Sequence, residues 1–449
     1  MITNTSRTVF SCLVKRRLRF PLFVVAVTTL LLPALTQCAP APKSGPVVGV
    51  NGSTASFLDS IGVNIHTIYN DTPYGDGPRV VSLVASLGAK HVRDALVVNR
   101  AADQVPVLIG LAARGVKSTL LVGDPAVPTR TGSVSDKIAE LTGPLNGAVD
   151  AVEGANEWDC SGRASWPQEL RADQARWRSA LKADPATARL ILAGPSFCRG
   201  ASPAVFGAHP ESMDVGSFHP YAGGGIPEGT IQTGMSTARQ DAGNLPLWAT
   251  EVGYNIATSD TKASQPAVSE SQAAVYLLRS FLENYRLGVQ RTYAYELFDE
   301  FSDPAKTNME ADFGLVRHDG IVKPAYAALQ SMISTLKATS NGGTSREGLA
   351  YTIANAPADL HQLLLDSGDG QHVLVLWRAA QVAPTAPPSP DTNAPQVTVQ
   401  LKQPVSGSMS WPSRAGSAAK PVPTATTISV PVSGEPVVLK LKTGSNPVL

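Results

Sequence analysis

The sequence predicts an α/β protein: a (β/α)8, or TIM, barrel followed by a small antiparallel β-sandwich. Between residues 57 and 338, strand-like and helix-like patterns alternate eight times, and such a barrel typically needs about 250 residues. The candidate strands are near-continuous apolar runs, as is typical of parallel strands buried on both faces. After about residue 340, short β-type runs separated by Pro, Gly and Ser take over, which favours an antiparallel sandwich.

Eight strands are expected in the first region, with helices between them. Apolar residues recur at three-to-four spacing over 78–88 and 269–288, where Ser269 is a suitable N-cap, and the final helix is expected over 323–338. An open doubly wound sheet is the competing arrangement, but no Gly-rich phosphate loop follows the first strand, which disfavours its nucleotide-binding form. The expected strands are 61–69, 91–98, 117–124, 149–157, 189–197, 214–222, 245–252 and 291–298.

These patterns divide the chain into four parts. Residues 1–37 are predicted to be an export signal and 38–56 a linker or tether. The barrel is expected over 57–338 and the accessory β-sandwich over 339–449. The run GPVVGV at 45–50 is a candidate for an extra strand of the sandwich.

The first segment is interpreted as an export signal because a basic stretch precedes an apolar one. The apolar run 20–36 is short for a membrane span, although a retained N-terminal anchor is the alternative. Cys38 follows Leu-Thr-Gln, which resembles a bacterial lipoprotein cleavage site except that Gln37 is unusual there. Free secretion and attachment to the outer surface of a bacterial cell through a lipidated Cys38 therefore both stay open.

Charge and cysteine content restrict the partners. The formal net charge of +1 becomes −4 without residues 1–37, because that segment holds five basic and no acidic residues. A slightly acidic protein lacks the basic face that nucleic-acid binding needs.

Cys160 and Cys198 would lie on one rim of the barrel. Export favours a disulfide between them, and two unpaired thiols are the alternative. The histidines show no ligand spacing, so no metal site is expected.

Two glutamates are the strongest functional signal. Glu157 lies in VDAVEGANEWD (149–159) and Glu251 in LPLWATEVGYN (245–255), each at the end of an apolar strand. In a barrel of this kind the ends of the strands carry the catalytic groups. Two carboxyl groups that face one cavity can break a glycosidic bond, one as acid and the other as nucleophile or base.

The chain resembles the clan A glycoside hydrolases, the retaining (β/α)8 enzymes with an acid/base after strand 4 and a nucleophile after strand 7. Its layout is closest to families 39 and 5, and the likeness covers about residues 57–449. Two departures concern substrate identity: Trp158 stands where many members have Pro, and YELFDE (295–300) replaces the usual tryptophan of strand 8. The matching positions are Asn156 and Glu157 on strand 4, Glu251 on strand 7, Arg93 on strand 2, His219 and Tyr221 on strand 6, and the barrel-closing segment 313–329.

The resemblance implies roles for these residues. Glu157 would protonate the leaving oxygen and Glu251 would attack the anomeric carbon. Asn156 would donate to the sugar 2-hydroxyl, and Arg93 and Tyr221 would hold Glu251, although Arg93 at a strand end needs a carboxylate partner in any case. His219 and Trp158 are further substrate-binding candidates. Weaker candidates, for which packing or capping is an equal or better explanation, are Asn64, His66, Trp166, Tyr254, Asp299 and Glu300.

The expected protein is thus a monomeric glycosidase that acts on β-linked carbohydrate without cofactor or metal. A catalytically inactive carbohydrate-binding protein on the same scaffold is the alternative from another functional class. A barrel enzyme of another reaction class is a third interpretation, because fold alone does not determine chemistry.

Overall fold

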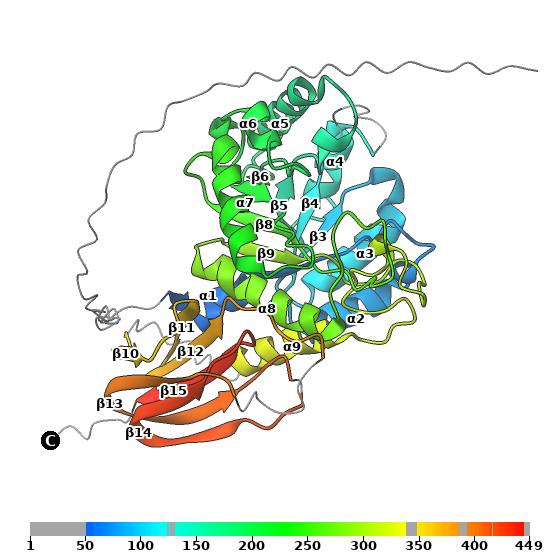
Figure 1. The fold of residues 1–449 in the computed structure, drawn as a ribbon. Coiled ribbons are helices and arrows are strands. Elements are labelled where there is room, and N and C mark those ends of the chain that lie inside the picture. Colours follow the sequence, from blue (N-terminus) through cyan, green and yellow to red (C-terminus); the bar gives the residue numbers. More distant parts are fainter. Residues whose placement is uncertain are drawn as a thin grey trace, which may run out of the picture. The chain divides into compact units, whose positions relative to one another are not determined.

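The structure, a computed structural model, describes residues 51–123, 125, 131–337, 348–385, 393–414 and 416–443. Its first sheet is a nearly closed barrel of eight parallel strands in the order β6-β5-β4-β3-β2-β9-β8-β7 (Figure 1), and a parallel bridge between Ala193 and Val215 lies at the seam. The predicted fold class is therefore confirmed. The strands are β2 Ile61–Asn64, β3 His91–Ala95, β4 Lys117–Leu121, β5 Val149–Glu153, β6 Ile191–Ala193, β7 Gly216–Phe218, β8 Leu247–Val252 and β9 Arg291–Ala294.

Most of the predicted strands extend too far toward their C-termini. The run 149–157 leaves the ladder after Glu153, and 291–298 leaves it after Ala294. The apolar pattern continues beyond the last ladder position because the loops that follow are also buried; Ala155 and Leu297 are 2% and 0% exposed. These extensions form the walls of the cleft described below.

Helices follow the strands and pack around the barrel (Figure 1). Ser269 caps α8 in a capping box with Gln272, as the sequence predicts for the N-cap. The α-helices are α1 Thr54–Asp59, α2 Gly77–Leu87, α3 Ala101–Ala112, α4 Val134–Thr142, α5 Trp166–Ala183, α6 Ser202–Phe206, α7 Pro227–Ala242, α8 Glu270–Arg286 and α9 Pro324–Lys337. Short 3-10 turns are η1 Pro73–Gly75, η2 Val98–Arg100, η3 Trp158–Cys160, η4 Pro210–Ser212 and η5 Met309–Ala311.

The barrel interior is filled by large side chains near the strand starts. Trp248 on β8 and Tyr293 on β9 are 1% and 0% exposed and pack with Ala151 and Ala193. Gly62 makes room for Tyr293, because a Cβ atom there would lie 2.4 Å from the Tyr293 ring. The filled interior leaves the C-terminal ends of the strands as the place for a ligand.

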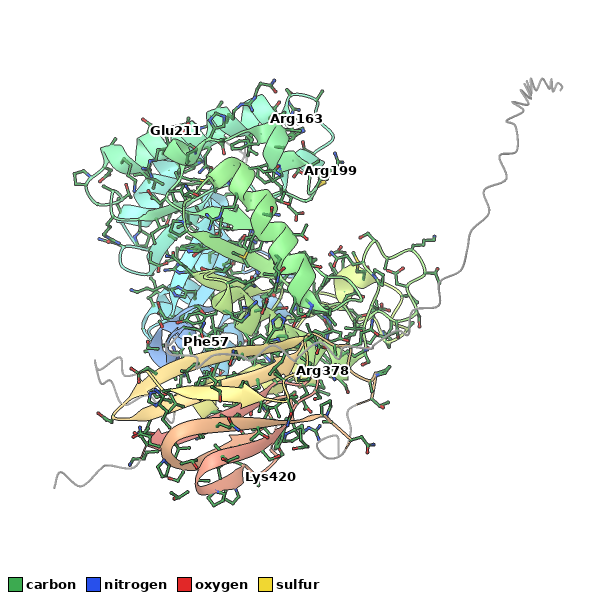
Figure 2. The ribbon with its side chains drawn as sticks, turned by 60° about the vertical axis from the view of Figure 1, so that its left-hand side comes forward. Phe57, Arg163, Arg199, Glu211, Arg378 and Lys420 are labelled. Atoms are coloured by element: carbon green, nitrogen blue, oxygen red, sulfur yellow. A yellow bond between two sulfur atoms is a disulfide. The ribbon has the colours of Figure 1, made fainter. Side chains whose placement is uncertain are left out.

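The second sheet belongs to the C-terminal domain and has the order β1-β11-β12-β15-β13-β10, with β14 paired to β13. This confirms the predicted β-sandwich. β1, Gly52–Ser53, pairs in parallel with β11, so residues that precede the barrel join this sheet; the predicted strand 45–50 lies outside the described residues. Figure 2 labels Arg378 and Lys420 in this domain and Phe57 on α1. The remaining strands are β10 Tyr351–Ala354, β11 Leu360–Gly368, β12 Gln371–Arg378, β13 Gln396–Ser410, β14 Lys420–Pro431 and β15 Val437–Thr443.

Within the described ranges, every helix is too short or too polar to span a lipid bilayer. The predicted export signal, residues 1–37, lies outside these ranges.

Candidate active site

A polar cleft of about 620 Å³ lies at the C-terminal ends of the barrel strands. Its walls come from the segments that follow β2, β5, β6, β7 and β9, together with side chains of β3 and β8. Six of the seven residues predicted to form the site line this cleft: Arg93, Asn156, Glu157, His219, Tyr221 and Glu251.

Glu251 lies on β8 at the floor of the cleft, with its side chain 9% exposed. The Arg93 guanidinium donates to Oε1 at 2.7 Å, and the Tyr221 hydroxyl donates to Oε2 at 2.7 Å. Burial raises the pKa of Glu251, but His219, Arg93 and Tyr221 together outweigh it, and the net pKa is below its usual range. Glu251 is thus held as an ionised carboxylate, the form that a nucleophile requires.

Arg93 is the centre of a buried network. Its guanidinium, 2% exposed, binds Glu153 through Nε at 2.6 Å and Nη2 at 3.0 Å, and it also donates to Asn64 and Asn156. Burial lowers the pKa of Arg93, but the carboxylates of Glu153 and Glu251 outweigh it, and the net pKa is raised. The sequence did not separate a structural role of Arg93 from a functional one, and the structure shows contacts of both kinds. Arg93 pairs with the buried Glu153 and with Glu251 in the cleft.

Glu157 follows the end of β5 in an unusual backbone conformation. Its φ of 49° lies in the left-handed region, which costs a non-glycine residue about 1–3 kcal/mol when the surrounding structure imposes it. Its N–H donates to the carbonyl of Ser196 at 3.1 Å. The side chain is 32% exposed, so Glu157 is open to the cleft whereas Glu251 is nearly covered.

His219 joins the two carboxylates. Its Nδ1 lies 2.8 Å from Glu157 Oε1 and 3.5 Å from Glu251 Oε2, and its Nε2 lies 3.1 Å from Thr250 Oγ1. Burial lowers the pKa of His219, but the two glutamates outweigh it and the net pKa is raised. One oxygen of Glu157 and one of Glu251 lie within 4.8 Å of each other. This fits the roughly 5–5.5 Å separation of retaining glycosidases better than the ~6.5–9.5 Å of inverting ones.

Asn156 is oriented by two donors. Arg93 Nη2 donates to its Oδ1 at 2.8 Å and Ser196 Oγ donates at 3.1 Å. Because Oδ1 accepts both bonds, the amide NH2 is the group that Asn156 presents as a donor. That is the chemistry expected for binding a sugar hydroxyl.

Trp158 is the predicted site residue that does not line the cleft. Its indole Nε1 donates to Glu169 Oε2 at 2.9 Å, and Glu169 also binds Arg163. The side chain follows η3 toward α5 and packs there. Sequence position beside Glu157 did not reveal this, because neighbouring residues of a turn point in different directions.

The weaker candidates separate into two groups. Asn64 and His66 line the cleft. Asp299 is instead paired with Lys323 at 2.6 Å. Trp166 packs against Phe197, Tyr254 packs against Tyr276, and Glu300 is not among the residues that line the cleft.

Several cleft residues were not predicted from the sequence. Tyr295 and Phe313 are two of them, and they form an aromatic wall with the predicted Tyr221, with ring centroids 5.6–6.3 Å apart. Glu310 on η5 is exposed and lines the cleft. A possible signal was the position of Tyr295 directly after the eighth strand, where the side chains face the barrel mouth; η5 lies in a long loop whose path sequence patterns do not predict.

Among the described residues, carboxylates and imidazoles gather in two places where a cation could be held. One group is Glu157, His219 and Glu251, and the other is His66, Glu296 and Glu300. The first already forms the hydrogen-bonded network described above. The predicted absence of a cofactor stays a prediction.

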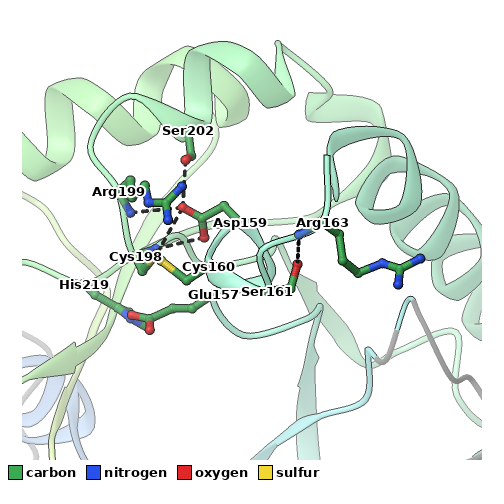
Figure 3. The surroundings of a disulfide bond; sticks show 9 residues. All are labelled: Glu157, Asp159, Cys160, Ser161, Arg163, Cys198, Arg199, Ser202 and His219. Atoms are coloured by element: carbon green, nitrogen blue, oxygen red, sulfur yellow. Dashed lines mark hydrogen bonds and ion pairs between the residues drawn. A yellow bond between two sulfur atoms is a disulfide. The ribbon is translucent and has the colours of Figure 1, made fainter. Parts of the chain in front are cut away.

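The predicted disulfide between Cys160 and Cys198 is present and joins the loop of Glu157 to the loop after β6 (Figure 3). Asp159, 2% exposed, strengthens the same junction: its carboxylate accepts from the N–H groups of Cys198 and Arg199 at 3.1 Å each and from Ser202 Oγ at 2.7 Å. Covalent and hydrogen-bonded contacts thus hold the segment that places Glu157 opposite His219.

Replacing Cys160 and Cys198 by serine is expected to destabilise the protein by roughly 2–4 kcal/mol, because the disulfide closes a long loop. Chemical denaturation, monitored by tryptophan fluorescence, measures the change. Asp159 remains in the variant, so the native fold is expected to persist below the transition. Equal stability of the two proteins would show that the Asp159 contacts alone hold the junction.

Comparisons with known proteins agree with this fold. No protein-family profile and no curated protein sequence matches the chain. Among solved structures, a monomeric beta-xylosidase from Caulobacter crescentus CB15 is similar over 90% of this chain and 98% of its own, with a TM-score of 0.56 and 17% identity. The GH39 enzyme from Xanthomonas axonopodis pv. citri is similar over 90% of this chain and 100% of its own, with a TM-score of 0.57 and 14% identity. The likeness to family 39 that the sequence predicts is therefore confirmed for the fold, from the barrel through the β-sandwich.

Proposed function

We propose that this protein is an exported retaining glycoside hydrolase that cleaves β-linked oligo- or polysaccharide. The observation that carries the proposal is the placement of Glu157 and Glu251 in one polar cleft, with carboxylate oxygens within 4.8 Å. Their environments differ, since Glu251 is buried among donors and Glu157 is open to the cleft, and the two roles in a double displacement need different environments.

The reaction proceeds in two steps. Glu251 attacks the anomeric carbon while the glycosidic C–O bond breaks and the Glu157 proton passes to the leaving oxygen. Water then attacks the glycosyl-enzyme, its proton returns to Glu157, and the bond to Glu251 breaks. Asn156 donates to the sugar 2-hydroxyl, and Arg93 and Tyr221 stabilise Glu251 when its charge is restored.

The anomeric configuration of the first sugar released distinguishes a retaining from an inverting mechanism. An aryl β-glycoside is incubated with the full chain, and ¹H NMR follows the anomeric signals before mutarotation. The β-anomer is expected first. An α-anomer first would overturn retention. Glycan binding without turnover, unchanged in Glu251→Ala, would instead support the carbohydrate-binding protein.

The charge of the cleft favours neutral sugars. Asp94, Glu157, Glu251 and Glu310 line it, and the only Lys or Arg among its described lining residues is Arg93. The Arg93 guanidinium is already bonded to Glu153 and Glu251. A carboxylate in a substrate would therefore lie near the ionised Glu251 and find no Lys or Arg other than the already bonded Arg93 among the described lining residues.

We expect aryl β-xylosides and β-glucosides to be hydrolysed at least about tenfold faster than the aryl β-glucuronide, since a net repulsion of only about 1.4 kcal/mol gives this ratio. The β-xyloside is the first substrate to test because one structural neighbour is described as a beta-xylosidase. The kcat/KM values of the three substrates provide the comparison. Equal or faster hydrolysis of the glucuronide would contradict this charge argument.

The acid limit of activity is expected to follow Glu251. Its folded-state pKa is lowered from 4.5, and the reaction needs the ionised form, so activity persists until the pH falls below that value. We therefore expect the acid limb of kcat/KM to lie below about pH 4.5, since this limb reports the free enzyme. Circular dichroism at each pH separates loss of activity from unfolding. A folded protein with an acid limb above about pH 5 would contradict the assignment.

Export and attachment form the cellular part of the proposal. The basic and apolar stretches of residues 1–37 support export, and Cys38 supports a lipid tether. Fatty-acid labelling that disappears in Cys38→Ser would support the tether, and release of unlabelled protein would support free secretion. A monomer is expected, which the elution volume in size-exclusion chromatography tests.

A further inference from the structure

A second buried carboxyl group lies beside the cleft and takes no part in the proposed reaction. Glu296 follows β9 by two residues, and its side chain is only 1% exposed. Burial of an ionised carboxylate is costly unless donors or cations surround it. The contacts of Glu296 therefore indicate which protonation state the fold supports.

Glu296 has few partners for a negative charge. The Tyr74 hydroxyl donates to Oε2 at 2.8 Å and itself accepts from the Phe298 N–H at 3.1 Å. Oε1 is buried without a hydrogen-bond partner among the described residues. The charged groups that act on it are acidic: burial raises the pKa of Glu296 well above its usual range, with Glu300, Asp299 and Glu251 adding to the effect and Tyr74 opposing it. The carboxyl group thus keeps its proton near neutral pH.

His66 is the group that faces Glu296. Its Nε2 is buried, has no hydrogen-bond partner among the described residues and lies 3.3 Å from Glu296 Oε2. Tyr69 stacks on the ring at 5.2 Å, and Tyr74 and Tyr295 meet it edge-on at 5.5 and 5.7 Å, so its plane is held on several sides. Burial lowers the pKa of His66 to about 4, so the ring is neutral under ordinary conditions and carries one N–H.

We propose that Glu296 is a neutral acid that donates a hydrogen bond to His66 Nε2 and thereby holds His66 in the Nδ1–H tautomer. Oε2 then accepts from Tyr74 and donates to His66, which uses both capacities of a carboxylic hydroxyl. His66 lines the cleft, so its Nδ1–H becomes a fixed donor for a hydroxyl of the sugar. Glu296 is a positioning residue, since it acts through His66. The tautomer of His66 does not depend on the proposed function; only the assignment of its ligand as a sugar hydroxyl rests on it.

The tautomer can be measured without any substrate. Histidine side-chain ¹⁵N correlation spectra of the full chain are recorded near neutral pH, and His66→Asn assigns the signal. We expect the neutral Nδ1–H pattern, unchanged by EDTA. An Nε2–H tautomer or a charged ring would overturn the proposal. Dependence of the pattern on a bound cation would overturn it too, by showing that His66, Glu296 and Glu300 form a metal site.

Two substitutions test whether charge or donation is required. Glu296→Gln cannot ionise and keeps a donor, so the Nδ1–H tautomer is expected to persist and kcat/KM to stay within about threefold of the wild type. Glu296→Met removes the donor, so the tautomer is expected to change and kcat/KM to fall by about tenfold, as for the loss of one hydrogen bond. Glu211→Gln, on an exposed side chain of η4 (Figure 2), is the control.

The outcomes remain distinguishable from failure of the proposed function. Equal losses in Glu296→Gln and Glu296→Met would mean that an ionised carboxylate is needed, which overturns the proposal. If Glu296→Met does not fold, the wild-type spectrum and Glu296→Gln still decide. An Nδ1–H tautomer in a protein that hydrolyses no glycan would support the inference and reject the glycosidase.

Discussion

Replacing Glu251 by glutamine is expected to lower kcat by a factor on the order of 10⁴–10⁶, the range lost when other hydrolases lose a covalent nucleophile or its equivalent. Glutamine keeps the shape: its oxygen can still accept from Arg93, and its NH2 can donate to the Tyr221 hydroxyl oxygen, both of which lie 2.7 Å from the present carboxylate. The loss therefore reports the missing negative charge. Steady-state hydrolysis of an aryl β-glycoside measures it.

A second variant, Glu251→Ala, tests whether Glu251 is the nucleophile, because its product with azide depends on that role. Azide can enter the vacated space and displace the leaving group directly, so a β-glycoside is expected to yield the α-glycosyl azide. Recovery of activity with this product would assign Glu251 as nucleophile. Retention of more than about a tenth of wild-type activity in Glu251→Gln would remove Glu251 from the reaction.

Replacing Glu157 by glutamine is expected to lower kcat/KM by about 10²–10⁴-fold for substrates with poor leaving groups, the usual contribution of a general acid. The loss is expected to shrink for dinitrophenyl glycosides, because these leave without a proton. Glu157 also serves as base in the second step, so the glycosyl-enzyme should then accumulate. Mass spectrometry of the quenched protein detects the added sugar on Glu251.

Azide separates this role from that of Glu251. In Glu157→Ala, azide attacks the glycosyl-enzyme formed on Glu251, so the expected product is the β-glycosyl azide. An equal loss for all leaving groups would contradict the acid role and indicate that Glu157 only positions His219, 2.8 Å away. The conservative surface change Glu211→Gln is the matched control for both variants.

Glu157 and Glu251 were predictable because each follows a local pattern: an apolar run that ends in a carboxylate at the edge where barrel strands present their side chains. Asn156, Arg93, His219 and Tyr221 were found through their likeness to known barrels. Trp158 shows the limit of that approach, since its indole binds Glu169 outside the cleft. Glu310 was missed because the loop that carries it lacks a regular period. Tyr295 lies within the predicted strand 291–298 and directly follows β9, but nothing in the local pattern marked it as a cleft residue.

The sequence by itself determined the alternation of strands and helices, the change to a β-rich domain and the two carboxylates at strand ends. These features depend on the periodic placement of apolar side chains along neighbouring residues. Only the tertiary structure decided which side chains contact the functional carboxyl groups and the arginine, and these contacts set their protonation states. Arg93 meets Glu153 across 60 residues and Tyr74 meets Glu296 across 222. Such pairs arise from closure of the barrel, and protonation depends on burial and neighbouring charge, neither of which local sequence periodicity encodes.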